Sequence, residues 1–385
     1  MSRTVLHVDL DAFFCAVEQI LNPELCGKAF VVGGSPQGRG VVSSASYPAR
    51  AYGVRNAMPT SQALRLCPGL TVVPVRHGVY SEYSHRVMRL LRDYGRAFEQ
   101  ISIDEAFLDI SGLNEAARVI AVEIQKRILA EVGLPASVGV ASNKLVAKIA
   151  SGRAKPNGIL VIEPGQEADF LKPMKVDELW GIGSATAARL NHAGIQTIGD
   201  LANANPQSVR AVLGKQAEAA MQRARGIDLS PVEEEHTARS ISSERTFARD
   251  VHDADALRAA LLAMSDEVAA RLREDGLYAR TVQLKLRWPD FTTITRQATL
   301  PVASQLGDDI FAVIEQLWRG VWRPGSDVRL IGVGVSELGT ASGQLPLFDA
   351  DRSEERAKLA QVTDELKAKY GDNIIGRASL RRTRR

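Results

Sequence analysis

Two apolar, strand-like runs of this chain end in acidic residues. The run 4–8 leads into Asp9, and the run 101–103 leads into Asp104 and Glu105. If the two strands are neighbours in one sheet, the alternation of side chains along a strand brings the three carboxylates together. Carboxylates that lie so close repel one another and need a cation. The sequence therefore predicts a sheet that carries an acidic cation site.

The expected donor atoms favour a hard divalent cation. Carboxylate oxygens suit Mg²⁺, which usually keeps water and substrate phosphates among its other ligands. Two such ions about 4 Å apart would hold both the attacking and the leaving oxygen of a phosphoryl transfer. For one acidic pair alone, an acidic turn at the end of a strand is an equally good interpretation.

Three further motifs accompany the two acidic stretches in a fixed order. They are Tyr47-Pro48-Ala49-Arg50, Ser142-Asn143-Lys144 and Ala154-Lys155-Pro156-Asn157-Gly158. The ordered set resembles the Y-family translesion DNA polymerases, and most closely their bacterial DNA polymerase IV branch. The resemblance covers about residues 1 to 340. Ser46 stands where the family more often has Asn, and Phe107 where it often has Tyr, but neither is an implied metal ligand.

The resemblance implies a template-directed DNA polymerase. In such an enzyme the primer 3′-hydroxyl attacks the α-phosphate of a deoxynucleoside triphosphate. Asp9, Asp104 and Glu105 would hold two Mg²⁺ ions, with the Leu10 carbonyl as an extra ligand. The resemblance also implies synthesis past damaged bases with low fidelity, and a chain that is distributive on its own. The sequence has no second acidic cluster of the exonuclease type, so we expect no proofreading.

The resemblance also implies which residues meet the incoming nucleotide. Tyr47, Arg50 and Lys155 would contact its triphosphate, to which Arg offers a fork of donors and Lys a point charge. Phe14 would pack under the sugar and exclude a 2′-hydroxyl, although an aromatic residue after a strand is usually core. The small residues 43–45 would leave room for a damaged template base, and a tightly packed strand is their alternative interpretation.

The order of the expected elements predicts an α+β multidomain fold, the right hand of a polymerase. Without residues 11–73, the first elements follow the order β-α-β-β-α-β of a ferredoxin-like sheet. We expect this sheet to be the palm, formed by 1–10 and 74–165. The insertion 11–73 would then be the small fingers domain.

The second half of the chain is expected to bind DNA. Residues 166–230 read as a helical thumb with a helix-hairpin-helix, whose glycines let backbone N–H groups approach a phosphate. A plain turn between helices with glycine caps is the alternative. Residues 231–238 read as an exposed linker, 239–340 as a little finger domain of order β-α-β-β-α-β, and 341–385 as a mobile tail.

The expected strands of the little finger carry hydroxyl and basic side chains. Such side chains on one sheet face suit contact with the backbone of duplex DNA, and a solvated sheet face is an equally good interpretation for any one of them. They are Arg239, Ser240, Ser242, Ser243, Arg245, Arg280, Lys285, Arg287 and Arg296.

The peptide 344–348 lies just past the last expected strand. It reads Gln344-Leu345-Pro346-Leu347-Phe348 and resembles the peptide by which bacterial polymerases bind the sliding clamp. Apolar residues on an exposed segment are unfavourable unless a partner buries them, and an extended peptide can fill a partner's pockets. The alternative is a tail segment that folds back on the chain's own surface.

Composition limits the other partners. The net charge of the 385 residues is only +3, so DNA binding must depend on where the basic residues lie. Cys15, Cys26 and Cys67 have no CxxC spacing, which argues against a zinc site or disulfide scaffold and fits a reducing cytoplasm. No apolar run is long enough for a membrane span, and the first residues lead directly into a strand rather than a signal peptide. We expect a cytoplasmic monomer that binds primer-template DNA.

Two other classes of protein compete with this interpretation. Another palm-type nucleotidyl transferase or a cyclase would also need paired carboxylates on such a sheet. It would not explain the helix-hairpin-helix or the clamp-like peptide. A non-catalytic DNA-repair binding module would not need the three carboxylates.

Overall fold

A computed structural model describes residues 3–234, 238–340, 350–371 and 374–378 of the chain. The chain divides into two compact units, 1–236 and 237–385, and each is described by itself. The peptide expected to bind a sliding clamp, 344–348, lies outside the described residues.

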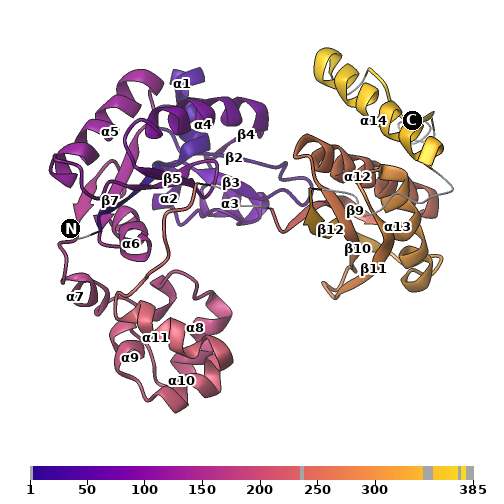
Figure 1. Cartoon of the computed structure of the whole chain (residues 1–385). Helices are drawn as coiled ribbons and strands as arrows, with labels where there is room; N and C mark the ends of the chain where they lie inside the picture. Colours follow the sequence, from indigo (N-terminus) through magenta and orange to yellow (C-terminus); the bar gives the residue numbers. More distant parts are fainter. Residues whose placement is uncertain (1–2, 235–237, 341–349, 372–373, 379–385) are drawn as a thin grey trace. The chain divides into compact units, whose positions relative to one another are not determined.

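A five-stranded sheet forms the centre of the first unit (Figure 1). Its spatial order is β5-β6-β1-β7-β8, and β1 is antiparallel to both of its neighbours. The strands are β1 (Val5–Leu10), β5 (Ala97–Gln100), β6 (Glu105–Asp109), β7 (Ala136–Ala141) and β8 (Ile159–Val161). The first four give the spatial order of a ferredoxin-like sheet, which confirms the expected arrangement. β8 extends that sheet parallel to β7.

Helices cover both faces of this sheet. The helices α4 (His77–Leu91) and α5 (Ala117–Val132) lie on one face and α6 (Lys144–Ala154) on the other (Figure 1). Side chains alternate between the faces: Leu6 and Val8 pack in the core under α4 and α5, whereas Val5 packs with α6. His7 and Asp9 therefore share the α6 face, which decides what surrounds the acidic residues.

The insertion after β1 builds a second, smaller sheet. Its order is β3-β2-β4, and its core is a separate apolar cluster. The elements of the insertion are α1 (Phe13–Leu21), the 3₁₀ turn Pro23–Leu25, β2 (Phe30–Gly33), β3 (Val42–Ala45), α2 (Tyr47–Ala51), α3 (Thr60–Leu66) and β4 (Thr71–Val73).

Short helices follow β8. They are α7 (Glu167–Leu171), α8 (Ser184–His192), α9 (Ile198–Asn203), α10 (Pro206–Leu213) and α11 (Ala217–Ala224), with 3₁₀ turns at Val176–Glu178 and Gly214–Gln216. Their buried residues join those of α6 in one cluster, so this helical segment and the five-stranded sheet share a core.

The second unit is a four-stranded antiparallel sheet with helices on one face. Its elements are β9 (Ser240–Val251), α12 (Ala254–Glu274), β10 (Tyr278–Arg287), β11 (Thr293–Ser304), α13 (Gly307–Val321), β12 (Val328–Gly339) and α14 (Ala350–Tyr370). The expected order β-α-β-β-α-β along the chain is confirmed. The spatial order β11-β10-β12-β9 differs from that of the first sheet, because the first strand lies at an edge instead of the centre.

Three expectations need correction. Residues 101–104 form a turn rather than the end of a strand, so Glu105 begins β6. Part of the expected linker 231–238 is not exposed, since Val232 is buried in the core of the first unit. Part of the supposed mobile tail is the helix α14, whose Asp364 pairs with Arg273 of α12 at 2.6 Å.

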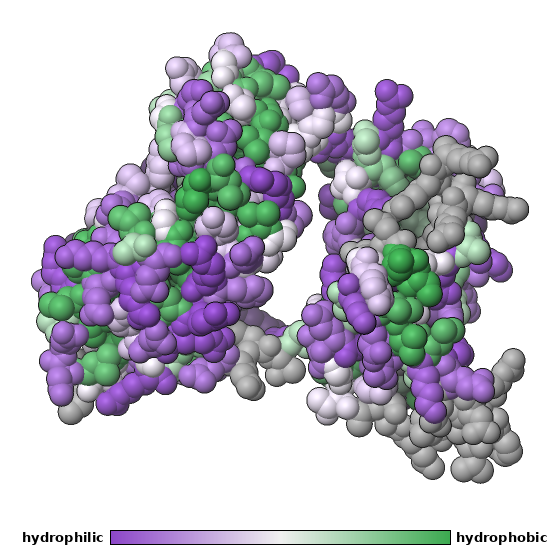
Figure 2. Space-filling view, turned by 90° about the horizontal axis from the view of Figure 1, so that it is seen from above, coloured by the Kyte–Doolittle hydropathy of each residue, from purple (hydrophilic) through white to green (hydrophobic). Residues whose placement is uncertain are grey.

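The molecular surface is mixed in character. On the face shown in Figure 2, hydrophilic residues surround small groups of hydrophobic ones. In the described ranges, no helix combines the length and the apolar character that a membrane crossing would require.

Candidate active site

Strand pairing brings two of the predicted acidic residues together. Asp9 of β1 lies directly opposite Glu105 of β6, on the face covered by α6. Possible ligand atoms of His7, Asp9 and Glu105 all lie within 4.8 Å of one another. This spacing is small enough for one cation to be shared.

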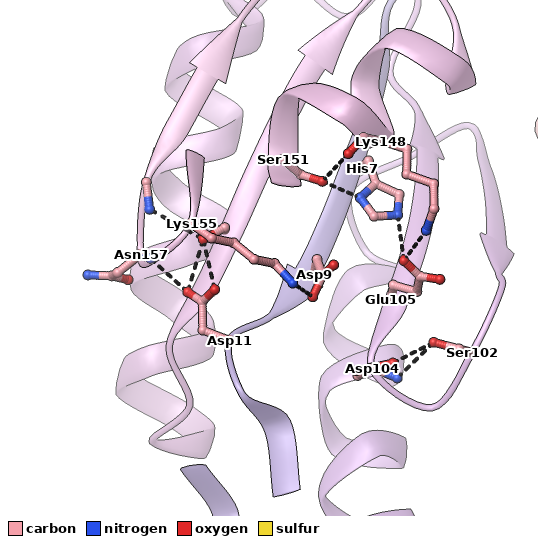
Figure 3. Close-up of polar contacts among 12 residues, drawn as sticks. His7, Asp9, Asp11, Ser102, Asp104, Glu105, Lys148, Ser151, Lys155 and Asn157 are labelled. Carbon is pink, nitrogen blue, oxygen red and sulfur yellow. Dashed lines mark hydrogen bonds and ion pairs between the residues drawn. The ribbon is translucent and has the colours of Figure 1, made fainter. Parts of the chain in front are cut away.

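Asp104 lies in the turn that precedes β6. Its carbonyl oxygen accepts a hydrogen bond from the Leu10 backbone N–H at 2.9 Å, which ties the turn to the end of β1. Its carboxylate accepts a hydrogen bond of 2.6 Å from the Ser102 hydroxyl (Figure 3). The predicted convergence is thus complete for Asp9 and Glu105, while the Asp104 carboxylate is turned toward Ser102.

Two lysines neutralise the acidic residues. Lys155 Nζ lies 2.6 Å from Asp9 Oδ1, and Lys148 of α6 pairs with Glu105 Oε2 (Figure 3). Burial raises the pKa of Asp9 to about 6, against the opposing effect of Lys155. Burial also acts to raise the pKa of Glu105, but hydrogen bonds from His7 and Lys148 outweigh it and lower this pKa to about 2.

His7 lies beneath Glu105 and is fully buried. Its Nε2 lies 3.1 Å from Glu105 Oε2, and its Nδ1 lies 2.7 Å from the Ser151 hydroxyl. Burial lowers the pKa of His7 to about 4, so the ring is neutral at neutral pH. The Ser151 hydroxyl also donates to the Lys148 carbonyl at 2.8 Å, so the His7 ring lies between the backbone of α6 and the Glu105 carboxylate.

Asp11 organises the other side of the site, and the sequence interpretation missed it. Its buried carboxylate accepts hydrogen bonds from the Ser137 hydroxyl, the Tyr47 hydroxyl and the Asn157 backbone N–H, at 2.9, 3.1 and 2.7 Å. Burial and this carboxylate raise the pKa of Tyr47, which therefore remains a neutral donor. The role of Asp11 could have been predicted from the sequence Asp9-Leu10-Asp11, because alternate residues of a strand place both carboxylates on one face.

The helix α2 holds Tyr47 and Arg50 in place. Ser46 caps this helix through its side chain, which accepts the Ala49 N–H at 3.4 Å. Arg50 lies over the Tyr47 ring at 5.0 Å and donates to the Ala45 carbonyl at 2.9 Å. The Ser at position 46 thus serves as a helix cap in this chain.

One pocket collects several predicted site residues from different parts of the chain. Phe14 lies in its wall and stacks on Tyr80 with ring centres 4.2 Å apart. The Tyr80 hydroxyl is in turn held by Glu18 at 2.6 Å, so the Phe14 ring rests on a fixed support. The lining residues are Leu10, Ala12, Phe13, Phe14, Ser43, Ser44, Arg50, Asn56, Ile103, Asp104 and Lys155.

The helical segment adds a glycine hairpin next to α6. Gly181 has a φ of +97°, and Gly183 precedes the first turn of α8, with both glycines exposed. Trp180 of the same hairpin lies under Lys148, whose Nζ is 5.5 Å from the ring centre. The first residues of α8 are exposed and no side chain of the described residues caps the helix, but the phosphate contact stays a prediction.

In the second unit, residues of β9, β10 and β12 line a depression on the four-stranded sheet. Lys285 on this face pairs with Glu244 at 2.8 Å, so the face is not purely basic. Ser243 points the other way and donates to Glu267 of α12, so its expected place among the DNA contacts is wrong. The lining residues are Ser240, Ile241, Ser242, Glu244, Gln283, Lys285, Gly332, Val333, Gly334, Val335 and Ser336.

Comparison with known proteins identifies the family. The impB/mucB/samB family matches residues 8–152, its C-terminal domain 238–347, and its helix-hairpin-helix motif 164–195. The DNA polymerase IV of Dehalococcoides mccartyi strain 195 is 41% identical over 96% of this chain and 95% of its own length. That of Methanoculleus marisnigri is 43% identical over 88% of this chain and 95% of its own.

Solved structures agree with these relatives. A Y-family DNA polymerase chimera, Dbh-Dpo4(243-245)-Dbh, superimposes with a TM-score of 0.78 and 30% identity, over 87% of this chain and 98% of its own. DinB from Sulfolobus solfataricus superimposes with a TM-score of 0.61 and 31% identity, over 86% of this chain and 98% of its own. The chain belongs to the impB/mucB/samB family, the Y family of DNA polymerases. Within it, the chain lies in the DNA polymerase IV branch, as the sequence motifs predicted.

Proposed function

We propose that Asp9, Asp104 and Glu105 form the metal site at which this chain extends a DNA primer. The chain is a DNA-directed DNA polymerase of the translesion family, and this family uses divalent metal ions and deoxynucleoside triphosphates. The pairing of Asp9 with Glu105 on adjoining strands is the observation that carries the proposal. The rival classes, a cyclase and a non-catalytic module, would not account for relatives that match 96% of the chain.

The residues present suit two Mg²⁺ ions. The site offers carboxylate oxygens, with the Leu10 carbonyl as a further donor, and these are the atoms that Mg²⁺ prefers. Lys155 and Lys148 lie beside Asp9 and Glu105 and carry positive charge at the same site. Bound ions would supply Lewis acidity to the attacking hydroxyl and to the leaving pyrophosphate.

The side chains around the acidic residues would then hold the nucleotide. Lys155, whose ammonium group lies beside Asp9, would contact the triphosphate together with Arg50. Tyr47, oriented by Asp11, adds a neutral donor. These groups would stabilise the charge that develops on the leaving pyrophosphate. Phe14 would face the sugar and exclude a 2′-hydroxyl, and its place in the wall of the same pocket supports this role.

The domain assignment follows the same family. We propose that the palm comprises 1–10 and 74–165 and the fingers 11–73. The helical segment 166–230 would be the thumb and 239–340 the little finger. The sheets and helices of the two units support these limits.

We also propose the partners. The chain would bind primer-template DNA as a monomer in the cytoplasm. It would bind a sliding clamp through Gln344, Leu345, Leu347 and Phe348, a peptide that follows β12 in the chain. The three cysteines, which are all free, support a reducing compartment.

A primer-extension assay with Mg²⁺ on a defined template tests the proposed site. Asp104→Ala and Glu105→Ala should each lose extension by several orders of magnitude while DNA binding stays within about twofold, because only the metal ligands change. Asp93→Ala is the matched control, since Asp93 is an exposed carboxylate paired with Arg127. Extension by both site variants at the rate of the control would overturn the assignment.

A further inference from the structure

The loop between β7 and α6 binds three separate points of the chain. Its residues Ser142 and Asn143, with Lys144 as the first residue of α6, form the motif to which the catalytic proposal gives no function. Ser142 donates to Glu167 at the start of the helical segment. Asn143 caps α6 by accepting the Val146 N–H at 3.0 Å, and it donates to the Gly226 carbonyl at 2.9 Å.

Lys144 makes the third contact through a buried ion pair. Lys144 is 7% exposed and Glu99 of β5 is 5% exposed. The Lys144 ammonium lies 2.8 and 2.6 Å from the two Glu99 oxygens and 3.0 Å from the Pro231 carbonyl. Its three N–H donors therefore have three acceptors, which is the condition under which a buried charge is tolerated.

Glu99 completes the attachment. One of its oxygens accepts the Glu233 backbone N–H at 3.0 Å. The Lys144–Glu99 pair thus binds the main chain at both Pro231 and Glu233, and Val232 between them is buried. The attachment lies inside the first unit, on residues that the sequence predicted to be an exposed linker.

Other contacts hold the preceding residues. The Leu145 N–H donates to Asp228 at 3.1 Å, and Arg3 donates to the Ser230 carbonyl at 2.6 Å. Both contacts precede the Lys144–Glu99 attachment along the chain. The last point fixed by a described hydrogen bond before β9 is therefore Glu233, which leaves residues 234–239 before Ser240.

We propose that Lys144, paired with Glu99, is a positioning residue that sets the length of the connection between the two units. The pair holds the chain at Pro231 and Glu233, so the covalent connection to β9 is six residues long. Six residues span at most about 20 Å. Without the pair, Val232 loses the polar contacts on both sides of it, and its one apolar side chain alone would have to hold the segment. We expect this segment to detach, so that the fixed point moves back to Ser230 and the connection grows to the nine residues 231–239, which adds about 10 Å.

The length of this connection matters for the grip on DNA. When two linked modules bind one ligand, the effective concentration of the second falls as roughly the 3/2 power of the linker length. Lengthening from six to nine residues should weaken binding to primer-template DNA about twofold. This consequence rests on the proposed function, whereas the attachment itself does not.

The experiment measures the distance between the two units of the full chain without DNA. Spin labels would be placed at Glu82→Cys and Glu274→Cys, two exposed positions, after Cys26→Ser removes the exposed native thiol. Double electron–electron resonance then gives the distribution of distances. In Lys144→Met, the distribution should broaden and reach distances about 10 Å longer than in the unsubstituted chain.

A double variant separates attachment from stability. Lys144→Met alone leaves the Glu99 carboxylate buried without its lysine and should lower the melting temperature. Lys144→Met/Glu99→Met removes both charges and should recover much of the lost stability. The broad distribution should remain in the double variant, because the chain is no longer held at Pro231 and Glu233.

Arg127→Met is the matched control. Its ion pairs join α5 to Glu131 on the same helix and to Asp93 just after α4, and they do not touch the connection, so its distribution should match that of the unsubstituted chain. If the folded double variant also shows an unchanged distribution, the Lys144–Glu99 pair contributes only stability and the proposal is wrong. The distance measurement does not require polymerase activity. Its result therefore tests the attachment independently of the proposed catalytic site.

Discussion

Asp9 and Glu105 each face a lysine across a short distance. Lys155 follows α6 and Lys148 lies on it, so both lysines depend on that helix for their position. The acidic residues could be predicted from the sequence because each follows an apolar run. Their lysine partners could not, because Lys148 and Glu105 are 43 positions apart and meet only in the folded chain.

Phe14→Ala tests whether Phe14 selects the sugar of the incoming nucleotide. Removal of the ring should raise ribonucleotide insertion relative to deoxyribonucleotide insertion by about 10- to 100-fold, because a 2′-hydroxyl no longer meets an aromatic wall. Single-nucleotide insertion kinetics measure the ratio. Phe13→Leu is the control: Phe13 borders the same pocket but is only 3% exposed, so the substitution should change stability more than sugar choice. Equal discrimination in Phe14→Ala and the unsubstituted chain would reduce Phe14 to a packing residue.

At the scale of elements, α6 connects the sheet, the acidic site and the helical segment. The sequence analysis did not predict this helix, and the reason is physical. Its buried face includes Ala147, Ala150 and Ser151, so the contrast between apolar and polar positions is weak. The helix approaches the sheet closely, since a Cβ built on Gly139 of β7 would lie 2.0 Å from the Ala147 carbonyl oxygen.

Gly139→Ala should therefore displace α6 from the sheet. The new methyl group has backbone atoms in its way, and such overpacking costs about 1–3 kcal/mol of unfolding free energy. The insertion rate should also fall, because Lys148 and Ser151 move relative to Glu105 and His7. Urea unfolding and single-turnover insertion would measure the two effects.

Gly152→Ala on α6 is the control for this substitution. A Cβ at Gly152 meets no atom within 4 Å, and alanine stabilises a helix interior by about 0.5–1 kcal/mol relative to glycine. This variant should be at least as stable as the unsubstituted chain and equally active. Equal stability of the Gly139 and Gly152 variants would contradict the close packing of α6.

At the scale of the whole molecule, the elements from β1 to β7, without the insertion 11–73, follow the same order along the chain as those from β9 to β12. The spatial orders of the strands in the two sheets differ. Alternating apolar residues predicted both sets of strands, because burial of one face produces that pattern. The spatial order could not be predicted in this way, since the same pattern suits a central strand and an edge strand. The clamp peptide remains a prediction from its resemblance alone.

Leu347→Ala/Phe348→Ala tests the clamp peptide in the full chain. Both side chains offer apolar area that a partner pocket could bury, so the double variant should bind a sliding clamp at least tenfold more weakly. Extension of short primed templates without a clamp should not change, because the peptide only raises the local concentration of the polymerase. Glu355→Ala on α14 is the control. Equal clamp binding by the double variant and the control would show that another segment is the anchor.

The most direct test of the central claim measures metal binding at the acidic site. Mn²⁺ can replace Mg²⁺ and be counted by electron paramagnetic resonance in the complex with primer-template DNA and a non-reactive nucleotide. The unsubstituted chain should bind two ions, and Asp9→Ala and Glu105→Ala should each lose at least one of them, whereas Asp93→Ala should keep both. Two ions bound equally well by all four proteins would contradict the assignment of the catalytic carboxylates.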